Sequence, residues 1–190
     1  MDKSLLIESS GLCFNIEPTS VHGIQEEKFK TGLLRLIGVP ATIVDAKNGN
    51  GRTYSTKVIE KALGALKESH IRVSNVVTNA YLKETDGKKH LLNDWLVLNT
   101  DNGKNLKSLI NAGVSIGTSI RGLKQLDEET KHVQEYDYLG TDAVGNPSAG
   151  TFAHSGKYQV KVESVSDEEA REITEAIENS GEEIEKDLRS

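Results

Sequence analysis

The chain of 190 residues is 36% hydrophobic and 27% charged, an ordinary composition for one globular domain with a core of its own. Its formal net charge of −6 is unevenly spread, because residues 166–190 hold ten acidic and three basic residues and carry −7, which leaves the rest near +1. A neutral body with an acidic tail argues against general nucleic-acid binding, which needs a basic face.

Two further functional classes are disfavoured by composition. Cys13 is the single cysteine, so neither an intramolecular disulfide nor a cysteine-based zinc cluster can form within one chain. No apolar run approaches the roughly 20 residues that span a bilayer, and the apolar run of residues 5–7 is too short for a secretory signal. We therefore expect an intracellular protein that does not enter a membrane.

The N-terminal part of the chain predicts strands and turns. Residues 1–31 predict a strand or an extended arm, followed by a loop. Residues 33–44 are rich in β-formers and predict a strand that bends near Gly38 and Pro40. The two Asn-Gly pairs in residues 48–54 tolerate positive φ, so this stretch predicts a tight turn or a hairpin loop.

A helix of about three turns should begin after Ser55 or Thr56, either of which is a suitable N-cap. Its inward face consists of apolar residues at helical spacing: Val58, Ile59, Ala62, Leu63 and Leu66. Two strands, residues 71–82 and 91–98, then form a hairpin around Asp86-Gly87.

Residues 101–103 predict a turn before a short helix that ends at Gly113. The inward residues of that helix are Leu106, Leu109 and Ile110. Residues 113–123 and 133–139 predict strands, and residues 140–150 a long turn-rich connection. The last strand is indicated by alternating Tyr158, Val160 and Val162.

Ser166 and Glu169 form a capping-box pattern at the start of an acidic helix. The narrow apolar stripe of this helix is Ala170, Ile173, Ala176 and Ile177. We expect a domain over residues 1–165 and an acidic helical tail over residues 166–190. Without βαβ alternation, the elements predict an α+β fold with a mainly antiparallel sheet.

The stretch 113–123 also carries candidate chemistry. Ser119 and Arg121 lie two residues apart, so a strand places them on one face, where a hydroxyl nucleophile would have a cation beside it. Gly122 allows the backbone to turn N–H groups toward a developing oxyanion. Ser115 is the alternative nucleophile, on the same face as Ser119.

A serine nucleophile needs a base, and the chain has five histidines: His22, His70, His90, His132 and His154. His70 lies at the junction of the first helix and the following strand, where a side chain can reach across a sheet edge. The histidines do not form pairs with metal-ligand spacing on a recognisable element, so we expect no metal and no cofactor.

Several stretches together resemble the prohead core proteases of tailed phages, the serine endopeptidases that mature the capsid. Residues 5–9, Leu-Leu-Ile-Glu-Ser, are similar to the start of that family. Residues 48–54 resemble its Asn-x-Asn-Gly-Arg-x-Tyr-Pro motif, and residues 117–123 its Gly-x-Ser-Ser-Arg-Gly-Leu motif. Residues 142–149 resemble its Asp-x-Val-x-x-Pro-Ser-Ala segment. The order of the motifs along the chain is that of the family.

The resemblance implies a herpesvirus-type maturation-protease fold, a β-barrel wrapped by helices. It places the nucleophile on Ser119 and the oxyanion arginine on Arg121. The implied partners are phage capsid and scaffold or core proteins, met inside the assembling prohead in the host cytoplasm; a homo-oligomer is left open. The implied cleavage follows Glu in Leu/Ile-x-Glu, and accessible termini then favour self-cleavage after Glu175 and Glu8 and disfavour cleavage at the loop site after Glu128.

The chain departs from the family where the base is expected. Residues 63–70 resemble a shortened Gly-Glu-Leu-(Asp/Asn)-His-Pro stretch, in which the base position falls on Glu68 and His70 follows two residues later. A second family histidine corresponds to Asn75. Two interpretations follow: an active protease that uses Ser119, His70 and Arg121, or a non-catalytic homologue that serves as a structural or scaffold component of the head.

Overall fold

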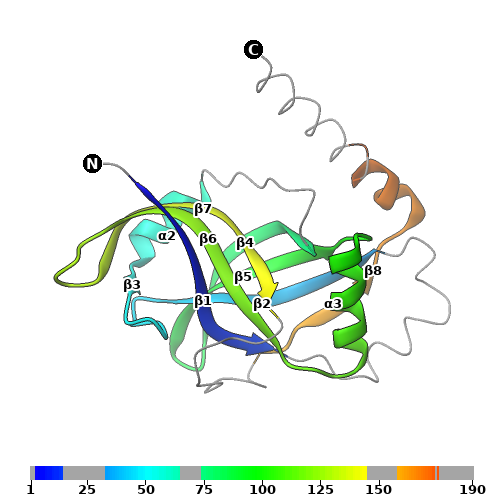
Figure 1. Cartoon of the computed structure of the whole chain (residues 1–190), viewed down its shortest axis with the longest axis horizontal. Helices are drawn as coiled ribbons and strands as arrows, with labels where there is room; N and C mark the ends of the chain where they lie inside the picture. Colours follow the sequence, from blue (N-terminus) through cyan, green and yellow to red (C-terminus); the bar gives the residue numbers. More distant parts are fainter. Residues whose placement is uncertain (1–2, 15–32, 65–73, 145–157, 174, 176–190) are drawn as a thin grey trace, which may run out of the picture.

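The computed structural model describes residues 3–14, 33–64, 74–144, 158–173 and 175. Their strands form two four-stranded sheets. Sheet A has the order β1 (Ser4–Phe14), β6 (Ile116–Leu126), β7 (His132–Val144) and β3 (Thr53–Tyr54). Sheet B has the order β4 (Asn75–Thr85), β5 (Lys88–Val97), β2 (Leu34–Val44) and β8 (Lys161–Ser164). The long strands of sheet A run across those of sheet B (Figure 1).

The α+β class and the mainly antiparallel pairing are confirmed. Within the described ranges, every strand pair is antiparallel except β3 with β7. The expected closed barrel is wrong, because the two sheets are open. Sheet A ends in β3, which has two residues, and sheet B ends in β8, which has four, so these short edges do not carry a ladder from one sheet to the other.

Helix α2 (Thr56–Leu63) begins at the N-cap Ser55, whose hydroxyl accepts from the backbone N–H of Val58 at 3.3 Å. The helix is shorter than the expected three turns, and the expected inward Leu66 lies outside the described residues. Its buried residues, Ile59 and Ala62, are on the predicted face.

Helix α3 (Asp101–Asn111) starts one turn earlier than predicted, so residues 101–103 are helix and not a turn. Thr100 caps it by accepting from the Gly103 N–H. Only glycine fits at position 103, because a Cβ there would lie 2.0 Å from the Leu98 carbonyl oxygen. The predicted end at Gly113 is confirmed: its φ is +68°, and the Val114 N–H donates to the Leu109 carbonyl in a Schellman arrangement.

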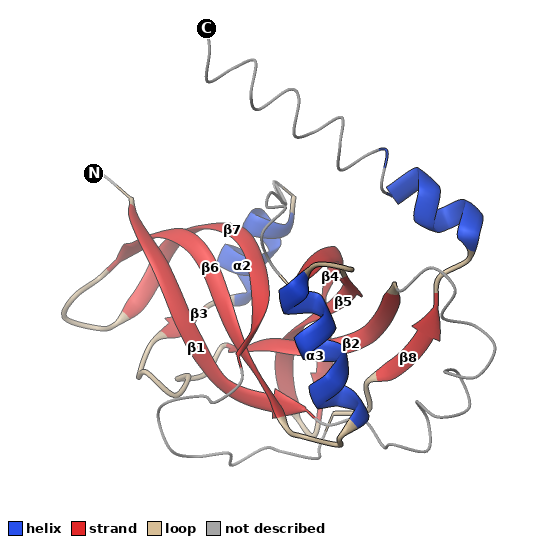
Figure 2. Cartoon of the chain, turned by 45° about the vertical axis from the view of Figure 1, so that its right-hand side comes forward, coloured by secondary structure: helices blue, strands red, loops and turns tan. Residues whose placement is uncertain are grey.

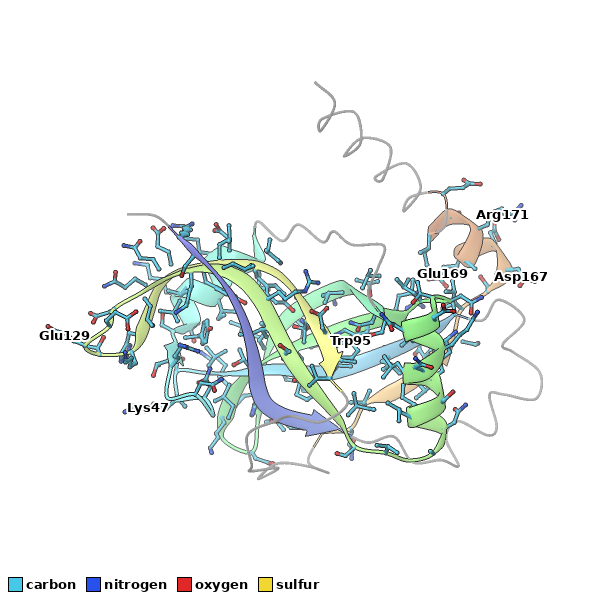
Figure 3. All side chains as sticks on the ribbon, viewed as in Figure 1. Lys47, Trp95, Glu129, Asp167, Glu169 and Arg171 are labelled. Carbon is cyan, nitrogen blue, oxygen red and sulfur yellow. The ribbon has the colours of Figure 1, made fainter. Side chains whose placement is uncertain are left out.

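Figure 2 shows the two sheets with α2 and α3 beside them, and the hydrophobic clusters contain residues from both sheets and both helices. One cluster surrounds the fully buried Trp95, which lies near the centre of the molecule in Figure 3, and receives Leu106 and Ile110 from α3. A second cluster joins α2 to both sheets through Tyr54, Ile59, Leu91, Ile120, Val133, Tyr136 and Tyr138. Burial of these side chains supplies the main stabilisation of the fold.

Two turns were predicted correctly from local chemistry. Asp86 and Gly87 both have positive φ, and they join β4 to β5. The loop at residues 48–54 closes around Asn48, whose side-chain oxygen accepts from the backbone N–H of Asn50 and of Arg52. This loop brings β3 against the start of β7.

The predicted connection at residues 140–150 is wrong for residues 140–144, which continue β7. Gly140, with φ +144°, and the register shift beside it absorb the irregular sequence. Beyond Gly140 the pairing with β6 resumes, so Asp142 and its neighbours are strand residues.

The acidic tail begins as a helix at residues 167–173, to the right in Figure 1. Ser166 caps it by accepting from the Glu169 N–H at 3.2 Å, as predicted. The Glu169 carboxylate pairs with Arg35 of β2, and Ala170 and Ile173 pack against a small cluster of Leu33, Leu96, Leu98 and Val165. None of the described helices is long and apolar enough to span a bilayer.

Candidate active site

The register of β6 against β7 sets the geometry around Ser119. Ser119 pairs directly with Asp142, and Ile120 pairs with Thr141. Side chains of directly opposed residues share a face with Cβ atoms about 5 Å apart. Since Ile120 is buried in the core, Ser119, Arg121 and Asp142 lie together on the other face of sheet A.

Arg121 forms an ion pair with Asp142, the residue opposite Ser119. Its Nε donates to Asp142 Oδ2 at 2.6 Å, and the two side chains are 11% and 23% exposed, so water screens the pair little. Asp142 is opposite Ser119, so the ion pair lies on the same face of the sheet as the Ser119 hydroxyl. Ser119 itself is 5% exposed. The arrangement offers a hydroxyl with a fixed cation beside it.

Asn75, at the start of β4, holds the β7 segment that carries Asp142. Its Nδ2 donates to the Thr141 carbonyl at 2.8 Å, and its Oδ1 accepts from the Ala143 N–H at 3.3 Å. The amide thereby bonds to the backbone groups of the residues before and after Asp142, as a neighbouring strand would. Asn75 is fully buried and also accepts from the Ser74 hydroxyl. It therefore clamps one sheet to the other, and an amide cannot act as a base.

Gly122 has a steric reason to be glycine. A Cβ there would lie 2.3 Å from Cε2 of Tyr136, whose hydroxyl donates to the Arg121 carbonyl at 3.1 Å. The register also shifts between Arg121 and Gly122. The alternative nucleophile, Ser115, precedes β6, and its buried hydroxyl has no hydrogen-bond partner among the described residues.

The expected base, His70, lies outside the described residues, as do Glu68, His22 and His154. His90 belongs to sheet B, where its ring meets Tyr158 edge-on at 5.4 Å and its Nδ1 lies 3.0 Å from the Lys88 carbonyl. His132 is exposed and pairs with Thr53, ten residues along β7 from Asp142, or about 33 Å. Neither of these two histidines is therefore placed to serve Ser119.

The expected self-cleavage sites lie in different surroundings. Glu8 is in β1, where it pairs with Ile120 of β6. Glu175 is exposed near the end of the described part of the tail. The disfavoured site after Glu128 is in the β6–β7 turn, close to Glu129 at the hairpin tip in Figure 3.

That turn is closed by Asp127, whose carboxylate accepts from the backbone of Thr130 and Glu129. These bonds favour the ionised carboxylate and so lower the pKa of the Asp127 carboxyl.

A cavity of about 460 Å³ lies elsewhere, on sheet B. It is lined by Ile37, Gly38, Tyr81, Lys83, Glu84, Thr85, Leu92, Tyr158, Gln159 and Lys161. A concave site is the usual place for small ligands, but none of the Ser119 group lines this cavity. Among the described residues, no three His, Cys, Asp or Glu side chains gather as metal ligands would.

Sequence reasoning missed Asp142 as a member of the site. The residue lies in a Gly-, Asn- and Pro-rich stretch that is typical of a loop, and the one available signal was that Asp142 is the single charged residue in residues 140–150. Its position opposite Ser119 depends on the β6–β7 register, which local pattern does not determine.

Comparison with protein families and with curated protein sequences found no match. Among solved structures, the chain is similar to a capsid assembly protease of a bacteriophage. That protein is gp21 of bacteriophage T4, with 21% sequence identity and a TM-score of 0.49, and the match covers 77% of this chain and 100% of that chain.

Proposed function

We propose that this chain is a prohead maturation serine endopeptidase in which Ser119 is the nucleophile. The observation that carries the proposal is the grouping of Ser119, Arg121 and Asp142 on one face of sheet A, with the Arg121 guanidinium held at 2.6 Å from the carboxylate. We also propose that the fold is of the herpesvirus-type maturation-protease class.

The reaction is acyl transfer. The Ser119 oxygen attacks the scissile carbonyl while its proton passes to the base, for which we propose His70. The Arg121 guanidinium and the backbone around Gly122 stabilise the oxyanion. The base then protonates the leaving amine, and water releases the acyl group by the same route. We propose capsid and scaffold or core proteins as substrates, cut after Glu in Leu/Ile-x-Glu inside the prohead.

Self-cleavage is proposed after Glu175 and Glu8. A protease needs an extended, opened segment, so Glu175 should be cut first, since Glu8 must leave its pairing with β6. The closed turn at Glu128 should be spared. Intact mass of purified wild-type protein over time, beside Ser119→Ala, checks this order; a first cut after Glu128 would contradict it.

The test of the nucleophile uses a fluorophosphonate probe and a scaffold-protein substrate of the same phage. Ser119→Ala should lose labelling and cleavage while it stays folded, and Ser115→Ala is the matched control that should retain both. Labelling that survives in Ser119→Ala and disappears in Ser115→Ala would move the nucleophile to Ser115.

A second candidate function is a non-catalytic head component of the same fold. The observation in its favour is Asn75, whose amide is fully used as a clamp where the resembled family has a histidine. A wild-type chain that neither reacts with the fluorophosphonate nor cuts the substrate, but co-assembles with scaffold protein, would favour this candidate.

A further inference from the structure

The direction of the Arg121 guanidinium depends on its partner. An arginine side chain has several rotatable bonds, so an unheld guanidinium samples many positions. Here Nε donates to Asp142 Oδ2 at 2.6 Å, which is the short distance of a charge-assisted bond. A bond through Nε fixes the plane of the guanidinium close to its stem, and hence its direction along the strand.

Asp142 is itself held more firmly than a surface carboxylate. Its backbone pairs with that of Ser119 on one side. On the other side, Asn75 bonds to both of its neighbours, Thr141 and Ala143. The position of the Asp142 carboxylate is therefore restricted by its backbone contacts, and it determines where the Arg121 guanidinium is held.

The burial of the Asp142 carboxylate also costs stability. Asp142 Oδ1 is shielded from solvent and has no hydrogen-bond partner among the described residues. A buried acceptor left unbonded is destabilising, and such groups in folded proteins call for an explanation beyond packing.

We infer that Asp142 is the positioning residue that holds the Arg121 guanidinium beside Ser119, so that the cation is in place before the oxyanion forms. The inference rests on the proposed function and adds to it a residue that does not touch the substrate. Asp142 acts only through Arg121, which makes its effect conditional on that arginine.

The test is a double-mutant cycle on the full chain with Asp142→Asn, Arg121→Met and the double variant. The readout is the rate of fluorophosphonate labelling, in which the Ser119 oxygen bonds to phosphorus, fluoride leaves and the serine proton passes to the base. Loss of an oxyanion donor costs about 10²- to 10³-fold. We expect the maximal labelling rate to fall by about 10²- to 10³-fold in Arg121→Met and by about 10- to 100-fold in Asp142→Asn. The affinity for the probe should not change.

In the Arg121→Met background, Asp142→Asn should change the rate by less than about twofold, because there is no guanidinium left to position. Asp142→Glu, which keeps the carboxylate, should recover part of the rate. Effects that multiply in the double variant, or an Asp142→Asn rate equal to wild type, would overturn the inference.

A second measurement needs no catalysis. The Nε–H proton of Arg121 in wild-type protein should exchange with water far more slowly than that of the exposed Arg171, with Arg121→Lys used to assign the NMR signal. Equally fast exchange would overturn the inference even if the variants were unfolded. A wild-type chain that is never labelled would overturn the proposed function together with this inference, whereas a labelled chain with an additive cycle would overturn the inference alone.

Discussion

Asn75→Ala should be among the most destabilising single substitutions in this chain. The amide makes bonds of 2.8, 3.3 and 2.9 Å to Thr141, Ala143 and Ser74, and it joins sheet B to the end of β7. Alanine removes all three bonds and leaves no side chain that can replace them. Water cannot easily compensate, because residue 75 is fully buried and Thr141 is 1% exposed.

The magnitude follows from the groups left behind. A buried backbone carbonyl or N–H without a partner costs about 1–3 kcal/mol. The Thr141 carbonyl is buried and the Ala143 N–H partly so, which gives about 2–5 kcal/mol, and we expect about 3 kcal/mol. With a urea dependence of about 2 kcal/mol per M, the unfolding midpoint should fall by about 1.5 M.

Urea unfolding followed by tryptophan fluorescence measures this shift, since Trp95 is the single tryptophan and is buried. Asn79→Ala is the matched control on the same strand. Its amide is exposed and donates to Asp94 at 3.2 Å, so its loss should cost less than about 0.5 kcal/mol. Equal midpoints for the two variants, or an Asn75→Ala shift below about 0.3 M, would refute the clamp.

Two further predictions concern backbone fit and acid stability. Gly103→Ala should cost about 1–3 kcal/mol of stability, because its Cβ would meet the Leu98 carbonyl oxygen at 2.0 Å. Gly64→Ala is the control and should be tolerated, since the nearest contact of its Cβ is at 3.6 Å. Thermal melts compare the two variants, and equal melting temperatures would contradict the prediction. Hydrogen bonds from the hydroxyl and backbone N–H of Thr56 lower the pKa of the Asp45 carboxyl. The stability it contributes is present above the unfolded-state pKa and is lost as pH falls through the lowered folded pKa, so wild type should lose more stability than Asp45→Asn between about pH 6 and about pH 2, and parallel curves would refute this.

Local chemistry predicted the parts of the fold that local chemistry controls. Asp86-Gly87 adopts the positive φ values of its hairpin, Gly113 ends α3, and Ser55 and Ser166 cap their helices. Each of these depends on a few adjacent residues. Whether the sheets close into a barrel is not a local property, because it depends on which edge strands pair, and these come from distant parts of the chain.

The candidate site was predictable only in part. Ser119 and Arg121 share a strand face because they are two residues apart, and this needs no tertiary information. The start of α3 was missed because Asp-Asn-Gly is typical of a turn unless a cap such as Thr100 precedes it. Asp142 and Asn75 were missed as a pair, since a register shift at Gly140 and a contact between two sheets bring them together.

The pairing of β1 with β6 has a consequence for how the chain folds as it leaves the ribosome. Ile7 pairs with Arg121, so more than a hundred residues separate partners in adjacent strands. At synthesis rates of about 5–20 residues per second, β1 waits about 6–23 s before its partner strand exists. Contacts of such sequence separation form slowly and late. The strand that carries Ser119 therefore gains its outer neighbour only near the end of folding, so the self-cleavage that we propose has to wait until synthesis is nearly complete.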